Sequence, residues 1–386
     1  MLEALGREID IPEHLLEKAT DRYLAVGRHL DRPASSIKHL EPEISPQGSI
    51  LLGTVTRPIG DADEYDFDLV CLLNATKLDY TQARLKAAVG EEIKVYAASN
   101  NMHEDPDEGR RCWTLTYSDG EKFHMDILPA IPDRQAYQAL LAHKGHRLLA
   151  SDPTVVDHAI AITDKEHPSY HWLSNDWLVS NPKGYAAWFK MRQVEEVIRR
   201  KRTLVDGRVY ASVEDVPDHR VKTPLQRAIQ LLKRHRDAMF QGQDERPISV
   251  IITTLAAHAY RGENTIKDAL AAILLTMNRY IEDPGGVEWV RNPVNPEENF
   301  ADRWVGDPAR EKAFYEWLDA ARRDFGNFLT APVSRIPKDF QEAMTLKTMA
   351  KVSSRIFAAA MPAVAALADE AADMKDAGQD HKPWAR

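Results

Sequence analysis

Apolar residues recur at helical spacing near the N-terminus and through most of the second half of the chain. Residues 12–30 place them three and four positions apart, and an Arg-Pro pair ends the segment. The same spacing predicts further helices over residues 81–89, 182–202, 223–240, 247–260, 266–280, 308–325 and 339–373. The helix from residue 223 has the best-defined start, because Thr223 can cap it, Pro224 suits its first turn and Gln226 can complete a capping box.

Residues 44–128 show a different pattern, in which short runs of strand-forming residues are separated by Gly, Pro and Asp clusters. We predict strands over residues 67–73, 111–117 and 122–128 and an exposed acidic loop over residues 100–109. Asp119 and Gly120 lie between the last two strands, and an Asp-Gly pair is a strong signal for a tight hairpin. We therefore divide the chain into a mixed α/β part at residues 1–165, a helical part at residues 166–375 and a flexible tail at residues 376–386.

The composition suits a folded globular protein, with 44% hydrophobic and 28% charged residues. No run of about 18 apolar residues is present, and the first ten residues carry acids where a secretion signal needs positive charge. We therefore expect a cytoplasmic protein that does not enter a membrane. The net charge of −9 disfavours a broad nucleic-acid-binding surface, since such surfaces are usually basic. Two cysteines, Cys71 and Cys112, are too few for a disulfide framework or a four-cysteine zinc site.

Two aspartates mark the most informative segment, residues 47–73. Asp66 and Asp68 lie two apart in a predicted strand, so both carboxylates leave the same face. Two carboxylates that point the same way repel each other unless a cation lies between them, and their oxygens suit Mg²⁺. The predicted hairpin returns a third acid, Asp126, in the next strand. Three carboxylates on adjacent strands can hold two Mg²⁺ ions for phosphoryl transfer.

Upstream of these acids, Gly48 and Ser49 offer a close backbone approach and a hydroxyl group to a phosphate. Each element has an ordinary structural explanation when taken singly, because Asp-x-Asp occurs on solvated strand faces and Gly-Ser occurs in turns. The combination is more specific. Gly-Ser, then Gly53-Thr54, then Asp-x-Asp, then a third aspartate on a hairpin is the pattern of the polymerase-β-like nucleotidyltransferases.

Residues 47–73 resemble the catalytic core of the cyclic GMP–AMP synthase and oligoadenylate synthase superfamily. They are most similar to the bacterial CD-NTases, which make cyclic oligonucleotide signals in CBASS anti-phage defence. Later segments also resemble that family, at residues 180–185, 230–237, 247–252 and 292–299. The resemblance implies an α+β fold, in which a polymerase-β-like lobe is followed by an α-helical C-terminal lobe, with the active-site cleft between them.

The resemblance also implies a set of site residues. For the metal ions and for catalysis these are Asp66, Asp68 and Asp126, with Mg²⁺ as the ion and Mn²⁺ as an alternative. For the nucleotide they are Gln47, Gly48, Ser49, Arg57, Lys233 and Ser249.

The pattern of the helix at 223–240 agrees only in part with the role implied for Lys233. Its apolar positions predict a buried stripe formed by Leu225, Ile229 and Leu232. Its cations, Lys233, Arg234 and Arg236, spread around the flanks of that stripe, where charged side chains are usually solvated. The pattern alone therefore favours a solvated lysine, whereas the resemblance places it on a triphosphate.

We expect an enzyme that joins nucleoside triphosphates, ATP with GTP or another nucleotide, into a cyclic di- or trinucleotide for CBASS antiviral defence. One alternative is a template-independent RNA nucleotidyltransferase with linear products, which the acidic net charge disfavours. Another is an inactive nucleotide-binding scaffold, which the three intact carboxylates disfavour. The expected partners are the nucleotide substrates, an effector protein that responds to the product and a CBASS regulatory protein. The animal relative that senses DNA uses a zinc site, and two cysteines cannot build a site of that kind. We therefore do not expect activation by nucleic acid.

Overall fold

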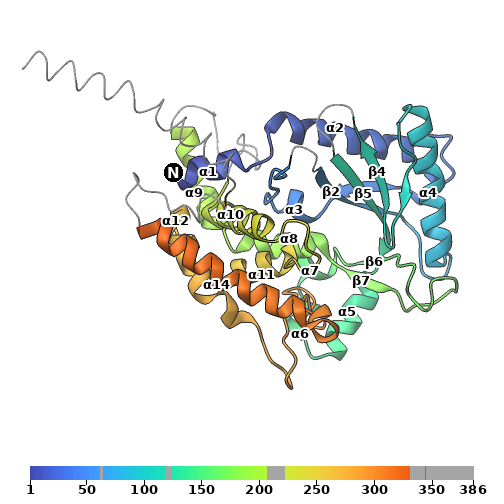
Figure 1. The fold of residues 1–386 in the computed structure, drawn as a ribbon. Coiled ribbons are helices and arrows are strands. Elements are labelled where there is room, and N and C mark those ends of the chain that lie inside the picture. Colours follow the sequence, from blue (N-terminus) through green and yellow to red (C-terminus); the bar gives the residue numbers. More distant parts are fainter. Residues whose placement is uncertain (61–63, 119–122, 207–221, 331–343, 345–386) are drawn as a thin grey trace, which may run out of the picture.

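The computed structural model describes all residues except 61–63, 119–122, 207–221, 331–343 and 345–386. Figure 1 shows a β-sheet with α2 (Glu13–Leu30) and α4 (Gln82–Ser99) beside it, and a cluster of helices from the second half of the chain next to the sheet. This arrangement confirms the predicted α+β class. None of the described helices is long and apolar enough to cross a membrane.

Seven strands of the described residues form one sheet, in the order β1-β2-β5-β4-β3, with β6 and β7 continuing from β5. Their bounds are β1 Glu43–Pro46, β2 Tyr65–Leu72, β3 Asp107–Glu108, β4 Trp113–Tyr117, β5 Phe123–Pro132, β6 Ile160–Ile162 and β7 Leu178–Ser180. β2 and β5 run parallel to each other, and the other pairs are antiparallel. The predicted strands are confirmed, while β3 occupies part of the segment predicted as a loop. The turn of the predicted hairpin, at 119–122, lies outside the described residues.

The prediction for the third strand was wrong at its end, because β5 continues past Pro129. Its antiparallel pairing with β4 reaches Ile127, and its pairing with β6 starts at Ala130. Pro129 therefore lies where the strand changes its antiparallel partner, a position where the missing N–H group of proline is tolerated.

The helix predicted over residues 81–89 is also longer than expected, since α4 continues to Ser99. Gly90, the first residue past the predicted end, is a packing position. A Cβ atom there would lie 2.1 Å from the Trp113 ring, so the glycine lets the indole of β4 approach the helix closely. α2 and α4 contribute to one hydrophobic cluster with the inner face of the sheet and so cover that face.

The other regular elements of the described chain are helices. Their bounds are α1 Leu2–Glu8, η1 Lys38–Leu40, α3 Gly48–Leu51, α5 Arg134–His143, α6 Arg147–Ala150, α7 Pro153–Val156, α8 Pro182–Met191, α9 Val194–Asp206, α10 Pro224–Met239, α11 Ser249–Ala259, α12 Ile266–Thr276, η3 Met277–Tyr280, α13 Arg303–Gly306 and α14 Pro308–Thr330. The helix predicted over 339–373 and the tail predicted at 376–386 lie outside the described residues. The domain boundary predicted after residue 165 falls between β6 and β7 and stays a prediction.

The single helix predicted over residues 182–202 is two helices, α8 and α9. Arg192 lies at the break, and its guanidinium donates to the carbonyl oxygens of Ala257 and Tyr260, both at 2.9 Å. These bonds tie the chain to the end of α11, an interaction that the local hydrophobic pattern does not reveal.

α10 starts with the predicted capping box between Thr223 and Gln226, and it lies among α1, α11, α12 and α14. Because neighbours surround it, its cations are buried along with its apolar stripe. Lys233 is 5% exposed, Arg234 2% and Arg236 4%, so the prediction of solvated flanks was wrong.

Candidate active site

Three carboxylates meet on the face of the sheet opposite α2 and α4. Strand alternation points Phe67 into the core and Asp66 and Asp68 to the other side. The parallel pairing of β2 with β5 sets Asp126 directly beside Asp68. One oxygen from each of the three carboxylates lies within 4.8 Å of the others, which is a spacing that suits metal ligands.

The electrostatics of this group favour a bound cation. Burial, together with Asp66 and Asp126, raises the pKa of Asp68 to about 7. Burial and the Asp126 carboxylate also raise the pKa of Asp66. Like charges held this close are costly unless a positive charge compensates them. A hard divalent cation with oxygen ligands matches both the donor set and its charge.

Neighbouring strands hold the third acid in place. The Thr114 hydroxyl on β4 donates to Asp126 Oδ1 at 2.5 Å. Sequence analysis did not single out Thr114, although the hairpin register pairs it with Asp126 and could have pointed to it. His124 lies two residues before Asp126 on β5. Its ring contacts the Glu64 carboxylate and lies 3.2 Å from the Thr116 hydroxyl.

Gly48 lies directly against the carboxylate of Asp68. Its φ of +58° lies in the left-handed region that favours glycine, and a Cβ atom would lie 2.4 Å from Asp68 Oδ2. The backbone N–H of Gln47 donates to the Asp68 carbonyl at 2.8 Å and fixes this turn against β2. The turn therefore needs glycine in order to lie next to the carboxylate.

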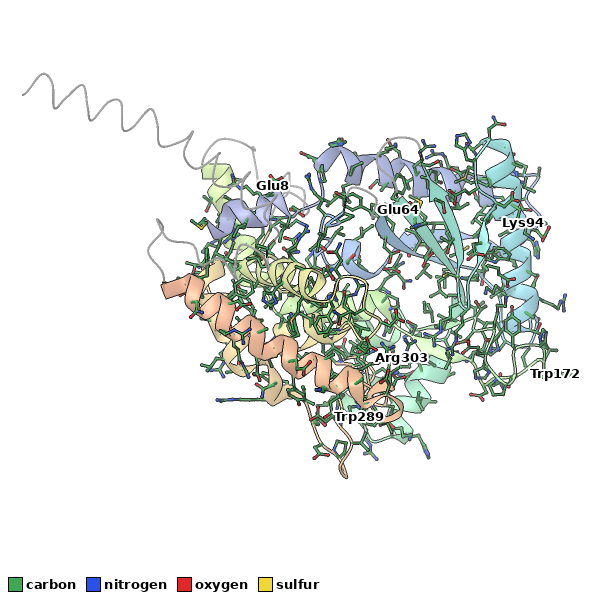
Figure 2. The ribbon with its side chains drawn as sticks, in the orientation of Figure 1. Glu8, Glu64, Lys94, Trp172, Trp289 and Arg303 are labelled. Atoms are coloured by element: carbon green, nitrogen blue, oxygen red, sulfur yellow. The ribbon has the colours of Figure 1, made fainter. Side chains whose placement is uncertain are left out.

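A cavity of about 680 Å³ opens in front of the carboxylates, between the sheet and the helical half of the chain. Of the predicted site residues, it is lined by Gly48, Ser49, Arg57, Asp66, Asp68, Lys233 and Ser249. Asp126 belongs to the carboxylate group but not to the cavity wall, and Gln47 does not line it. Glu64, labelled in Figure 2, lines the cavity just before β2.

Cations from α10 face the carboxylates across this cavity. The Lys233 ammonium donates to the Thr54 carbonyl at 2.9 Å, and burial lowers its pKa to about 8. Arg236 donates to the Ser249 hydroxyl at 2.9 Å, at the start of α11. Arg236 is itself neutralised by Asp237, so it positions Ser249. The Lys233 ammonium and the Ser249 hydroxyl at one end and the carboxylates at the other can hold a chain of phosphates together with its metal ions.

Part of the remaining wall comes from the start of α8 and from the loop before α13, where residues 180–185 and 292–299 resemble the family. Asn181 and Tyr185, at the start of α8, and Asn292, Glu298 and Phe300, in the loop before α13, all line the cavity. The Tyr185 and Phe300 rings lie 6.1 Å apart. No local pattern marked these residues individually, because their position in the wall depends on how α8 and the loop pack together.

Comparisons with known proteins agree with this geometry. A family model described as the nucleotidyltransferase domain of DncV-like cyclic GMP-AMP synthases matches residues 42–129. The c-di-GMP synthase of Roseivirga ehrenbergii is 30% identical over 300 residues, which are 77% of this chain and 70% of the relative. The cyclic dinucleotide synthase CdnG of Bradyrhizobium diazoefficiens is 28% identical over 335 residues, which are 82% of this chain and 73% of the relative.

The solved structure of the Bradyrhizobium diazoefficiens CD-NTase CdnG in complex with GTP has the same fold. It matches with a TM-score of 0.68 and 23% identity, and the match covers 92% of this chain and 97% of that one. The chain therefore belongs to the DncV-like CD-NTases and is a nucleotidyltransferase. The family expected from the sequence is confirmed.

Proposed function

We propose that this chain joins nucleoside triphosphates into a cyclic dinucleotide, with GTP as a substrate and Mg²⁺ or Mn²⁺ in the site. The observation that carries the proposal is the group of three carboxylates, which faces Lys233 and Ser249 across one cavity. A hydroxyl group of one nucleotide attacks the α-phosphate of another and displaces pyrophosphate. A second, intramolecular attack on the α-phosphate of the linear intermediate closes the ring and releases a second pyrophosphate.

Residues in different parts of the site have different roles in this reaction. Asp66, Asp68 and Asp126 would hold the divalent cations, whose charge would favour deprotonation of the attacking hydroxyl and neutralise the pyrophosphate leaving group. Lys233 has donors beyond the one that binds the Thr54 carbonyl, and they are available to a phosphate oxygen. The Gly48 backbone and the Ser49 hydroxyl lie at the cavity wall and orient the triphosphate.

Glu298 gives a chemical reason to expect guanine. It lines the cavity and accepts from the Asn292 amide at 2.7 Å, and burial raises its pKa. A carboxylate accepts from the N1–H and the 2-amino group of guanine, whereas adenine presents no such pair of donors. The sequence favoured ATP. A guanine nucleotide is supported by two similar proteins, one of which is named c-di-GMP synthase, while the other is the CdnG whose structure contains GTP.

Membership of the CD-NTases supports a place in CBASS defence, with an effector protein that responds to the product and a regulatory protein that controls the enzyme. We also propose that the enzyme works in the cytoplasm, where its substrates are made. The division into a catalytic part up to residue 165 and a helical part after it belongs to the same proposal.

The test is incubation of the purified chain with GTP, ATP or both, in Mg²⁺ or Mn²⁺, without nucleic acid. Products are then treated with phosphatase and identified by mass. We expect a cyclic dinucleotide that contains guanine, because a ring has no terminal phosphate to lose. Products that are only linear, or that require an RNA primer, would favour the RNA nucleotidyltransferase. Nucleotide that binds but is never converted would favour the scaffold.

Replacing the carboxylate of Glu298 tests the assignment of guanine. In Glu298→Gln we expect the preference for GTP over ITP, which lacks the 2-amino group, to fall about tenfold or more in kcat/KM, since a charge-assisted hydrogen bond is lost. Glu297→Gln is the matched control, because Glu297 pairs with Lys144 outside the cavity. An unchanged GTP to ITP ratio in Glu298→Gln would contradict the assignment.

A further inference from the structure

A second cavity, of about 370 Å³, lies in the helical half of the chain, behind one wall of the active site. It is formed by α8, α11, η3 and the loop that follows η3. It shares no lining residue with the active-site cavity. Its volume is at the lower end of the range for small-molecule sites, which is about 300–1,000 Å³.

Aromatic rings form one side of this second cavity. The Trp188 and His258 rings lie 4.9 Å apart, and the His258 and Tyr280 rings lie 5.3 Å apart and nearly parallel, at 20°. None of the three side chains has a hydrogen-bond partner among the described residues, and all three are only partly buried. Their N–H and O–H groups, and the parts of the rings that face the cavity, can therefore contact a planar ligand with acceptor atoms.

The charge of the second cavity is positive. Arg291 is neutralised by Glu282, whose carboxylate lies 2.6 Å from its guanidinium. Arg279, on η3, is exposed and has no ion-pair partner within the part of the chain that the structure describes. Burial and the nearby Arg192 lower the pKa of His258, which favours the neutral imidazole. The net charge of about +1 comes from Arg279, which can bind a carboxylate or a phosphate.

Residues adjacent in sequence line the two cavities at two places. On α11, Thr253 lines the active site and Thr254 lines the second cavity. In the loop, Asn292 lines the active site while its neighbours Arg291 and Pro293 line the second cavity. The Thr254 hydroxyl also lies 2.8 Å from the hydroxyl of Tyr185, an active-site wall residue. A ligand in the second cavity therefore packs against residues that shape the first.

We propose that the second cavity binds a planar aromatic molecule that carries one anionic group, and that its occupancy changes nucleotide binding at the active site through the shared wall. The ring packs against the aromatic side formed by Trp188, His258 and Tyr280, and the anionic group pairs with Arg279. A nucleoside monophosphate and an aromatic carboxylate share this chemistry, and the experiment distinguishes them.

The binding test is calorimetric titration of the full chain with GMP and, separately, with 2-aminobenzoate. We expect at least one probe to bind, and Arg279→Ala to weaken it about tenfold or more through loss of the charged contact. Arg303→Ala, which removes an exposed arginine outside both cavities, should leave the affinity unchanged. Binding of GMP alone identifies a phosphate ligand, and binding of 2-aminobenzoate alone identifies a carboxylate.

Lys233→Ala separates this site from the active site. A probe whose affinity falls in Lys233→Ala but not in Arg279→Ala occupies the active-site cavity, and that result would overturn the proposal. Absence of binding by both probes at millimolar concentration would overturn it as well. The coupling rests on the proposed function and is read separately, as a change in the KM for GTP that the bound probe causes in the parent and not in Arg279→Ala. An unchanged KM with the probe bound would refute the coupling without affecting the titration result.

Discussion

The carboxyl group of Asp68 lies between two other acids and is mostly shielded from water. Burial raises its pKa to about 7, and Asp66 and Asp126 add to the effect. The fold thus holds a destabilising arrangement that a divalent cation would relieve. Such arrangements are typical of functional sites, where perturbed groups serve chemistry at some expense of stability.

The stability of the metal-free protein should therefore depend on pH through Asp68. The folded pKa of about 7 lies above the unfolded value of about 3.9. The contribution of Asp68 to stability is fully present below pH 4 and is lost as the pH rises through 7. Between about pH 4.5 and pH 8, we expect the parent to lose on the order of 1–3 kcal/mol relative to Asp68→Asn, as measured by urea unfolding in EDTA.

Mg²⁺ supplies the control for this measurement. At pH 8 it should restore stability to the parent more than to Asp68→Asn, because only the parent keeps all three carboxylates. Parallel pH profiles for the two proteins would show that Asp68 titrates normally and that the cation is not needed to offset its charge.

Gly48 is the residue whose replacement should damage the site most selectively. In Gly48→Ala the new Cβ atom would displace the Asp68 carboxylate, and displacements of about 1 Å cost on the order of 10²-fold in rate. Positive φ adds about 1–2 kcal/mol of strain. Gly145→Ala is the control, because Gly145 has a φ of +88° and no atom of the described residues lies within 4 Å of the added Cβ. Equal activity of the two variants in pyrophosphate release would contradict this role of Gly48.

At the scale of elements, local patterns in the sequence located most helices and strands. They did not reveal how these elements pack against one another. The capping box of α10 was visible in the sequence because it uses neighbouring residues. The burial of Lys233 and Arg236 was not visible, because it depends on α1, α11, α12 and α14, which come from distant parts of the chain. The break between α8 and α9 was missed for the same reason, since it is fixed by bonds from Arg192 to α11.

The packing of α4 against β4 gives a prediction at this scale. Gly90→Ala places a methyl group within 2.1 Å of the Trp113 ring. Alanine favours helix by about 1 kcal/mol, but overpacking a core costs about 1–3 kcal/mol. Because the indole is rigid and its N–H donates to the Lys86 carbonyl at 2.9 Å, we expect a net fall in the free energy of unfolding.

Gly326→Ala is the matched control for this variant. Gly326 lies in α14, and no described atom lies within 4 Å of an added Cβ, so alanine there should stabilise the protein by up to about 1 kcal/mol. Thermal unfolding of both variants provides the comparison. Stabilisation of Gly90→Ala by a similar amount would mean that the helix–strand contact adjusts without cost.

At the scale of the molecule, the cavity is made by two parts of the chain that fold around different cores. One hydrophobic cluster supports the sheet with its carboxylates, and another supports α10 with its cations. The carboxylates were predictable from spacing, because strand periodicity alone puts Asp66 and Asp68 on one face. Glu298 was not predictable as a wall residue, because it reaches the cavity only after the loop before α13 packs beside α8.

The carboxylate group is the basis of the proposed reaction, so its removal is decisive. Pyrophosphate release from GTP in Mg²⁺ should fall by about 10³-fold or more in Asp66→Asn/Asp68→Asn, because metal ligands supply several kcal/mol of transition-state stabilisation. Asp105→Asn/Asp107→Asn repeats the same double change at two exposed aspartates with the same spacing and should release pyrophosphate at the parental rate. Release by Asp66→Asn/Asp68→Asn within tenfold of the parent would contradict the assignment of these carboxylates as the catalytic metal site.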